Sequence, residues 1–196
     1  MVTLLLTPGG RMSLSGIRML GLVGVSAAAK REIARELLEQ FPGQVVAAEQ
    51  TAIRGIDYIP AELANRDEEL FFHTFRAAYE TCVAVEKLTA WHARANGHKL
   101  VVTDFGRFSI APHLTLDERT SHFRDLLGCD LRTEMHIYDQ VVVVQSVSKE
   151  PDTILRDKNL SDIWSLHPRH TTLKERHTEH LIEHVVRIAH RMLSAT

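Results

Sequence analysis

"GLVGVSAAAKREIARELLEQF", from Gly21 to Phe41, is the stretch of sequence that decides the fold. It continues an apolar run, Ile17 to Val23, in which Arg18 is the one charged residue, and this run predicts a strand buried on both faces of a sheet. The run ends at Gly24, and a helical pattern follows from Ala27 to Phe41 until a Pro-Gly pair stops it. A buried strand that leads through a glycine into a helix is typical of a parallel α/β sheet.

The same alternation of apolar runs and helical patterns continues along the chain. We predict further strands at 44–48, 99–103 and 140–144, and helices at 58–65, 67–96, 116–127 and 170–193. The fold class is therefore α/β, a three-layer sandwich with a mainly parallel sheet of four or five strands. We expect Ile17–Val23 and Lys99–Thr103 to be its adjacent central strands. Residues 1–16 are expected to form a flexible tail, and 17–196 a single domain with a polar, lid-like segment at about 147–170.

Composition limits the classes of function. The chain has 196 residues and a net charge of -2, which gives no general attraction to nucleic acid or to anionic membranes. No apolar run approaches the length of a membrane span, and Met1–Leu6 is too short for the core of a signal peptide. Two cysteines, Cys82 and Cys129, suit a reducing compartment. We therefore expect a cytoplasmic protein with no membrane partner.

The turn after the first strand has part of a phosphate-binding motif, G-x-x-x-x-G-K-[ST]. Gly24 and Lys30 stand at the required spacing, but Ala29 replaces the second glycine and Arg31 replaces the hydroxyl residue. One interpretation is a helix N-terminus that binds phosphate, with Lys30 reaching the outer phosphates. The other is an ordinary turn that Ser26 caps, with Lys30 in solvent.

Further candidates follow the other strands, where parallel sheets bind ligands. Glu49 follows the second strand and could hold a substrate hydroxyl, with Arg54 nearby. Asp104 ends the third strand, where it could act as a general base or hold magnesium through water. Arg107 could neutralise a phosphate. The simpler alternatives are a solvated Glu49 and an Asp104 that caps the next turn.

The polar segment after the fourth strand, and the residues that follow it, are rich in basic side chains. They could close over phosphates as a lid, or remain solvated on the surface. The basic residues are Lys149, Arg156, Lys158, Arg169, Lys174 and Arg176. The last helix carries His177, His180 and His184 on one face, but no carboxylate or cysteine set accompanies them, and we predict no metal site.

Together these segments resemble the P-loop nucleoside and nucleotide kinase superfamily, in its thymidylate-kinase-like and small kinase-like ATPase branches. Nearly the whole chain, from about Ile17 to Leu193, takes part in the resemblance. Four stretches carry it: "IRMLGLVGVSAAAKREIARELLEQF", "VVAAEQTA", "KLVVTDFGRFSIAP" and "YDQVVVVQSV". They are similar to the strand with its P-loop and helix, the substrate-facing acid after strand two, the acidic signature after strand three, and the strand before the lid.

The resemblance implies a chemistry and a role for each candidate. ATP would be the cofactor, and its γ-phosphate would pass to a nucleoside- or nucleotide-like small molecule. Gly24, Ser26, Ala29, Lys30 and Arg31 would form the cofactor site, with Lys30 orienting phosphates. Asp104 would be the base or metal anchor, and Arg107 would stabilise charge. The substrate side would comprise Glu49, Arg54, Arg169 and Arg176.

Departures from the family pattern keep other classes open. Ala29 and Arg31 weaken the phosphate loop and argue against magnesium, and Phe105 stands where the family has an arginine. The fifth strand of the family also lacks an obvious counterpart in the sequence. A second class is therefore an inactive pseudokinase that serves as a binding or assembly module, with a protein partner or a second copy. A third is a Rossmann-type dinucleotide binder, with Glu49 as its ribose-binding acid.

Overall fold

The computed structural model describes residues 16–48, 68–104, 107, 128, 131–174 and 178–195. The strands are β1 (Arg18–Val23), β2 (Val45–Ala48), β3 (Leu100–Thr103), β4 (Gln140–Gln145) and β5 (His170–Lys174). The helices are α1 (Ala27–Gln40), α3 (Glu68–Ala95), α5 (Leu131–Met135), α6 (Pro151–Trp164) and α7 (Thr178–Ser194). The predicted α/β alternation is confirmed.

The strands form one parallel sheet of five in the order β2-β3-β1-β4-β5. β1 lies at the centre, where Gly21 stands opposite Thr103 of β3 and Val141 of β4. The prediction that the first and third strands are adjacent, parallel and internal is confirmed. Their mostly apolar sequences, with Arg18 and Thr103 as end residues, are explained by this place, because a central strand of a covered sheet meets no water on either face.

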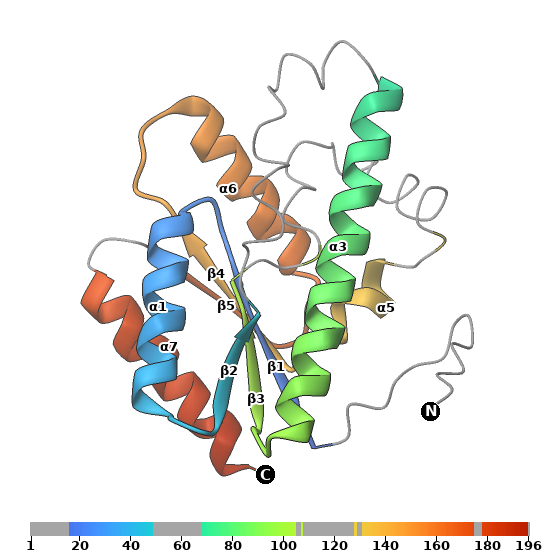
Figure 1. Ribbon diagram of the computed structural model, residues 1–196. Coiled ribbons are helices and arrows are strands. Elements are labelled where there is room, and N and C mark those ends of the chain that lie inside the picture. The colour runs from blue at the N-terminus through green and yellow to red at the C-terminus, as the bar shows by residue number, and fades with distance from the viewer. Residues whose placement is uncertain are drawn as a thin grey trace.

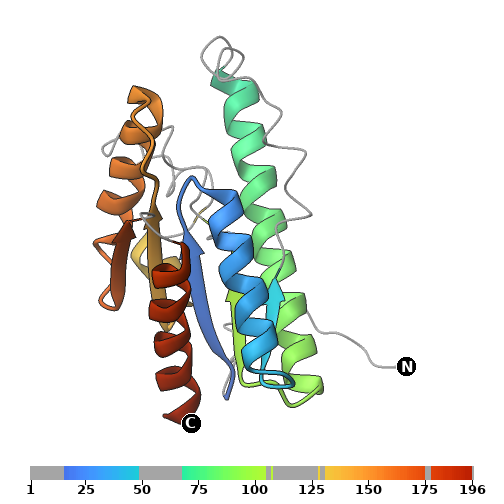
Figure 2. The same cartoon turned by 90° about the vertical axis from the view of Figure 1, so that its left-hand side faces the viewer.

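Helices cover both faces of the sheet, so the molecule has three layers (Figures 1 and 2). α1 and α7 pack together on one face, and α3, α5 and α6 lie on the other. Successive residues of β1 alternate between these layers: Leu20 and Leu22 pack towards α1 and α7, and Met19 and Val23 towards the opposite helices. The ring of Tyr138 lies against Gly21, where an added Cβ would stand 3.3 Å from it.

The structure differs from the prediction after β4. The segment predicted as an open polar lid contains α6, whose residues Leu160, Ile163 and Trp164 are buried against the sheet. Pro151 stands in the first turn of α6, where its fixed φ favours a helix start rather than a loop. The helix predicted at 170–193 also differs. Its first residues form the edge strand β5, and α7 begins only at Thr178. The predicted helices at 58–65 and 116–127 and the predicted tail lie outside the described residues, apart from Gly16.

Candidate functional site

Open parallel sheets bind ligands at their carboxyl edge, where the parallel strands end. The chain leaves β1 towards the face covered by α1, whereas α5 and α6, which follow β3 and β4, lie on the other face. Connections therefore diverge on both sides of β1, and ligands of open α/β sheets bind at such points. Gly24 and Asp104 directly follow β1 and β3, and Gln145 is the last residue of β4.

The turn after β1 is held tightly against β4. Gly24 has a φ of 141°, and a Cβ added there would stand 2.1 Å from the carbonyl oxygen of Val144. Only glycine fits this backbone conformation and this close approach. Two residues on, the Ser26 hydroxyl accepts a hydrogen bond of 3.4 Å from the amide of Ala29, so α1 has the predicted cap.

Lys30 is buried in the first turn of α1, with only 3 % of its surface exposed. The ordinary-turn interpretation combined a Ser26 cap with a solvated Lys30, and the structure has the cap without the solvated lysine. Arg31 is exposed, and its Nε donates a hydrogen bond of 3.1 Å to the carbonyl of Ala27 in the same helix. A buried ammonium group is costly unless the protein or a ligand compensates its charge, so Lys30 is an unusual feature of this turn.

Asp104 directly follows β3 and is buried. Its predecessor Thr103 is level with Gly21 of β1, so Asp104 lies beside the last residues of the central strand. The negative charge of Asp104 also affects the pKa of Cys82 on α3. Burial raises the pKa of the Cys82 thiol well above its usual value, and the negative charges of Glu86 and Asp104 add to this rise against the opposing charge of Arg107.

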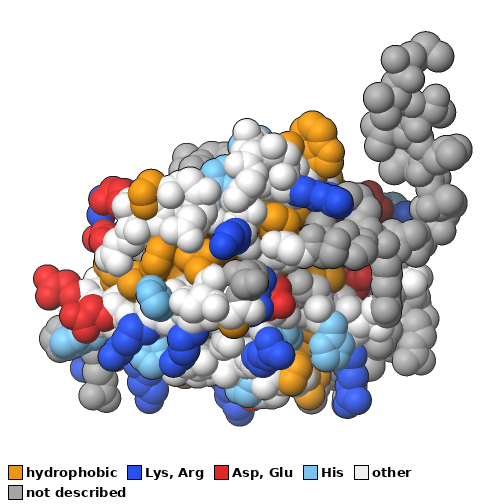
Figure 3. Space-filling model, turned by 90° about the horizontal axis from the view of Figure 1, so that it is seen from below, with side chains coloured by type: hydrophobic (Ala, Val, Ile, Leu, Met, Phe, Trp, Pro, Cys, Tyr) orange, Lys and Arg blue, Asp and Glu red, His pale blue; other side chains and the backbone are white. Residues whose placement is uncertain are grey.

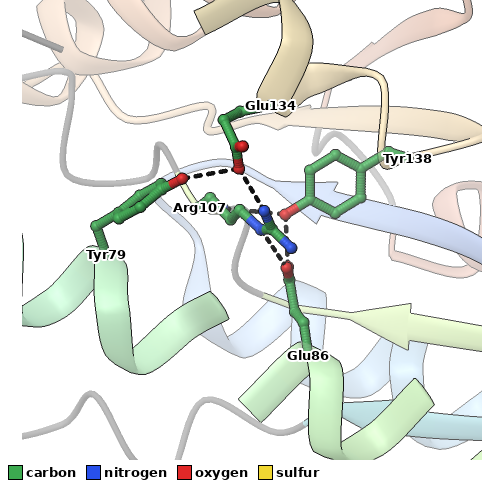
Figure 4. Close-up of polar contacts among 5 residues, drawn as sticks. All are labelled: Tyr79, Glu86, Arg107, Glu134 and Tyr138. Atoms are coloured by element: carbon green, nitrogen blue, oxygen red, sulfur yellow. Dashed lines mark hydrogen bonds and ion pairs between the residues drawn. The ribbon is translucent and has the colours of Figure 1, made fainter. Parts of the chain in front are cut away.

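Arg107 is buried in a network of polar side chains beneath α3 and α5 (Figure 4). Its Nε donates a hydrogen bond of 2.6 Å to Glu86 of α3, and its NH1 group bonds to Glu134 of α5. The hydroxyl of Tyr138 donates to Glu86 over 2.5 Å, and that of Tyr79 donates to Glu134 over 2.7 Å. The Arg107 amide in turn donates to the Tyr138 hydroxyl over 3.1 Å. The network ties the chain after β3 to two helices and to the approach to β4.

The network balances charge inside the protein. Burial raises the pKa of Glu86, although the charge of Arg107 and the hydrogen bond from Tyr138 oppose this rise. Burial alone would lower the pKa of Arg107, but Glu86, Tyr138 and Glu134 together outweigh burial, so the pKa is raised. Burial and the charge of Glu86 also raise the pKa of Tyr138, which stays protonated and donates. The guanidinium of Arg107 is thus engaged by two carboxylates, and its contact with a phosphate stays a prediction from the sequence.

The loop after β4 is held by α6. The amide of Ser146 donates a hydrogen bond of 2.7 Å to Asp157, and the Gln145 side chain donates one of 2.7 Å to the Ser161 hydroxyl. Asp157 is buried, whereas Lys149, before α6, is exposed. The carboxyl edge near β4 is therefore built on a packed helix.

The structure brings some predicted residues together and separates others. Gly24, Lys30 and Asp104 all belong to the carboxyl edge. Arg169 does not, because it precedes β5 and its carbonyl accepts from the amide of Val141 at the start of β4, at the opposite edge of the sheet. Its contact with substrate stays a prediction from the sequence. Glu49, Arg54 and Arg176 lie outside the described residues, as does His177.

Sequence reasoning missed the acids that hold Arg107. Glu86 was not singled out, yet it shares the inward face of α3 with Cys82 and Ala90, one turn away on either side. A carboxylate at that spacing within a buried stripe indicates a buried cationic partner. Glu134 lies in a short helix that the apolar pattern did not reveal.

No protein-family model matches the chain, and it has no significant match among curated proteins. In the part of the chain that the structure describes, no group of His, Cys, Asp and Glu side chains has the arrangement of a metal site. None of the described helices is long and apolar enough to span a bilayer.

Proposed function

We propose that the carboxyl edge around Gly24, Lys30 and Asp104 binds the phosphates of a nucleotide, and that the protein is a P-loop kinase-like enzyme. It would transfer the γ-phosphate of ATP to a nucleoside- or nucleotide-like small molecule. The observation that carries the proposal is the burial of Lys30 in the first turn of a helix that follows a glycine turn at the central strand. A helix N-terminus with a lysine in its first turn suits an anion.

Each of these residues has a part in the proposed chemistry. The amides at the start of α1 and the ammonium of Lys30 orient the phosphates and offset their charge. Asp104, one strand away, accepts the proton of the attacking hydroxyl or holds a metal through water. Arg31 stands where the phosphate-loop motif has a magnesium-binding hydroxyl, and its side chain bonds to Ala27. Binding of the nucleotide is therefore weak and largely independent of magnesium.

A second candidate is a nucleotide-binding relative without transferase activity. It is favoured by the buried methyl group of Ala29, which limits the approach of a phosphate to the backbone, and by the engagement of Arg107 within the protein. The Rossmann-type alternative is less well supported. Its usual strand order places the first strand beside the second, whereas β1 here lies between β3 and β4.

Calorimetric titration with ATP, with magnesium and with chelator, tests the proposal. Wild type is compared with Lys30→Gln and with the matched control Lys87→Gln, which changes an exposed lysine on α3. We expect Lys30→Gln to abolish binding and Lys87→Gln to leave it unchanged. ATP binding that Lys30→Gln leaves intact would refute a phosphate site at this turn.

A second pair of measurements separates the two candidates. The double change Ala29→Gly, Arg31→Ser restores the motif and should add magnesium-dependent binding. Incubation of wild type with ATP and a panel of nucleosides and nucleotides should give a phosphorylated product if the protein is a kinase. Binding without any product favours the inactive relative.

We also propose a cytoplasmic location, which the buried thiol of Cys82 suits.

A further inference from the structure

The opposite edge of the sheet, where the strands begin, carries a row of basic side chains. Lys99 immediately precedes β3, Arg18 begins β1 and Arg169 immediately precedes β5. Neighbouring strands lie about 4.8 Å apart, so the row from β3 to β5 is about 14 Å long. The row stands out in a chain whose net charge is -2.

The ends of the helices extend this row on both faces of the sheet. α7 ends beside β1, because the guanidinium of Arg18 donates a hydrogen bond of 2.9 Å to the carbonyl of Ala195. We call the basic region at this edge the amino-edge surface: Arg18, Arg94, Lys99, Arg169 and Arg191. Figure 3 views the molecule from this end, with Lys, Arg and His side chains spread over the lower half of the view and the Asp and Glu side chains there mostly at its left margin.

The cations of this surface differ from other arginines of the protein in their partners. Arg35, Arg76 and Arg107 form ion pairs with carboxylates. Among the residues that the structure describes, no carboxylate pairs with any side chain of the amino-edge surface. Their positive charge is therefore available to a partner.

Most carboxylates near this edge already have hydrogen-bond donors. Glu39 pairs with Arg35, and Glu36 accepts from Gln40. Asp139 accepts a hydrogen bond of 2.9 Å from the amide of Met19. Asp162, in the last turn of α6, is exposed. Positive charge therefore predominates at this edge of the sheet.

The helix dipole accounts for part of this charge only. A cation near a helix C-terminus is favourable, which explains Arg94 and Arg191. It does not explain Lys99, Arg18 and Arg169, which stand at the starts of strands, and β-sheets have little net dipole. The row therefore calls for a ligand with repeated negative charge.

We propose that the amino-edge surface binds the phosphate backbone of a single-stranded nucleic acid. Arginine predominates there over lysine, and its planar guanidinium matches phosphate oxygens with two hydrogen bonds. Trp91, near the end of α3, is 63 % exposed and stands on the same side of the helix as Lys87 and Arg94. An exposed indole between two cations provides a surface on which a base stacks, as single-strand-binding proteins use. This site is separate from the proposed nucleotide site and does not depend on it.

Fluorescence anisotropy with labelled 20-nucleotide dT and U oligomers measures the interaction. Contacts to about four phosphates give a slope of about -2.8 in the plot of log affinity against log salt. The double variant Arg169→Glu, Arg191→Glu should lose at least tenfold in affinity at low salt. It removes two of the phosphate contacts, so the slope should become shallower, with a magnitude of about 1.4 or smaller. Both residues are exposed, so the fold is unaffected. The matched control is Lys149→Glu, Lys158→Glu, which makes the same change of charge at exposed positions before and within α6, away from this surface.

Tryptophan fluorescence gives an independent measure. Trp164 is fully buried, so quenching by the oligomer reports on Trp91. We expect Trp91→Phe to abolish the quenching and to weaken binding at least about fivefold. Equal losses in the two charge variants, or no binding by wild type at 50 mM salt, would overturn the proposal. Binding to phosphatidylserine vesicles without binding to either oligomer would also overturn it, in favour of a membrane surface.

Discussion

Removal of Arg107 should destabilise the protein strongly, and a second mutation should partly restore it. Arg107→Met deletes the only cation of the buried network as Figure 4 draws it and leaves Glu86 and Glu134 facing the space it occupied. Glu86 is almost fully buried, so its carboxylate loses its ion pair and has no water nearby to replace it. Breaking a buried ion pair from one side typically costs about 3–5 kcal/mol. We expect a loss within this range at pH 8.

The loss should depend on pH with a definite sign. Burial already raises the pKa of Glu86 above its ordinary value, and loss of Arg107 raises it further. In the variant, the folded state then holds a proton on Glu86 at pH values where the unfolded state has lost it. The variant is therefore least impaired below the ordinary carboxyl pKa and loses stability as the pH rises towards the folded-state pKa. Each further unit of pKa corresponds to about 1.4 kcal/mol.

The double variant Arg107→Met, Glu86→Gln removes the stranded charge. It should be more stable than Arg107→Met alone by about 1–3 kcal/mol at pH 8, because an amide is cheaper to bury than a carboxylate. The free energy of unfolding is measured by urea denaturation, followed by circular dichroism at pH 5 and pH 8. The four proteins compared are wild type, Arg107→Met, Glu86→Gln and the double variant. With an m-value of about 3 kcal/mol/M, the midpoint of Arg107→Met should fall by about 1–1.7 M. Losses that simply add in the double variant, or that do not change with pH, would refute the assignment of the network as a compensated charge cluster.

Three further predictions concern the turn after β1 and the thiol beneath it. Gly24→Ala should cost more than about 2 kcal/mol in the same urea assay, because its Cβ meets the carbonyl of Val144, whereas Gly43→Ala, with nothing within 4 Å, should cost about 1 kcal/mol; equal costs would exclude the clash as the cause. Ser26→Ala should cost about 1 kcal/mol through loss of the cap, and no loss would show that the bond to the Ala29 amide is not stabilising. Cys82 should react with Ellman's reagent at pH 8 only after unfolding, since burial raises its pKa well above neutrality; rapid reaction of the folded protein would contradict its burial.

The apolar strands were predictable because burial on both faces leaves a simple pattern. β1, β3 and β4 are continuous runs of this kind, and their positions agree with the prediction to within a residue or so. β5 was not predictable, since an edge strand is only half covered and its sequence, HTTLK, has mostly polar side chains. α6 was missed because few of its residues face the sheet and Pro151 suggested a loop.

The candidate site was predictable only in part, for a related reason. A glycine turn between a strand and a helix is a local pattern, so Gly24, Ser26 and Lys30 could be found from the sequence. Whether Lys30 is buried depends on the packing of neighbouring elements, which no local pattern records. The partners of Arg107 come from α3 and α5, one on either side of it in the sequence, and only the folded chain shows that they meet.

The central position of β1 has a consequence for how the protein emerges from the ribosome. β1 is synthesised first among the strands, yet it pairs with β3 and β4 and not with β2. Arg18 pairs with Leu100 and Leu20 pairs with Gln140, so β1 cannot be hydrogen-bonded on both sides until β3 and β4 have been synthesised. Until then the nascent chain carries an unpaired, mostly apolar segment, and such segments are prone to aggregate and are shielded by chaperones. The turn at Gly24, pressed against Val144, takes its final shape only once most of the chain has been translated.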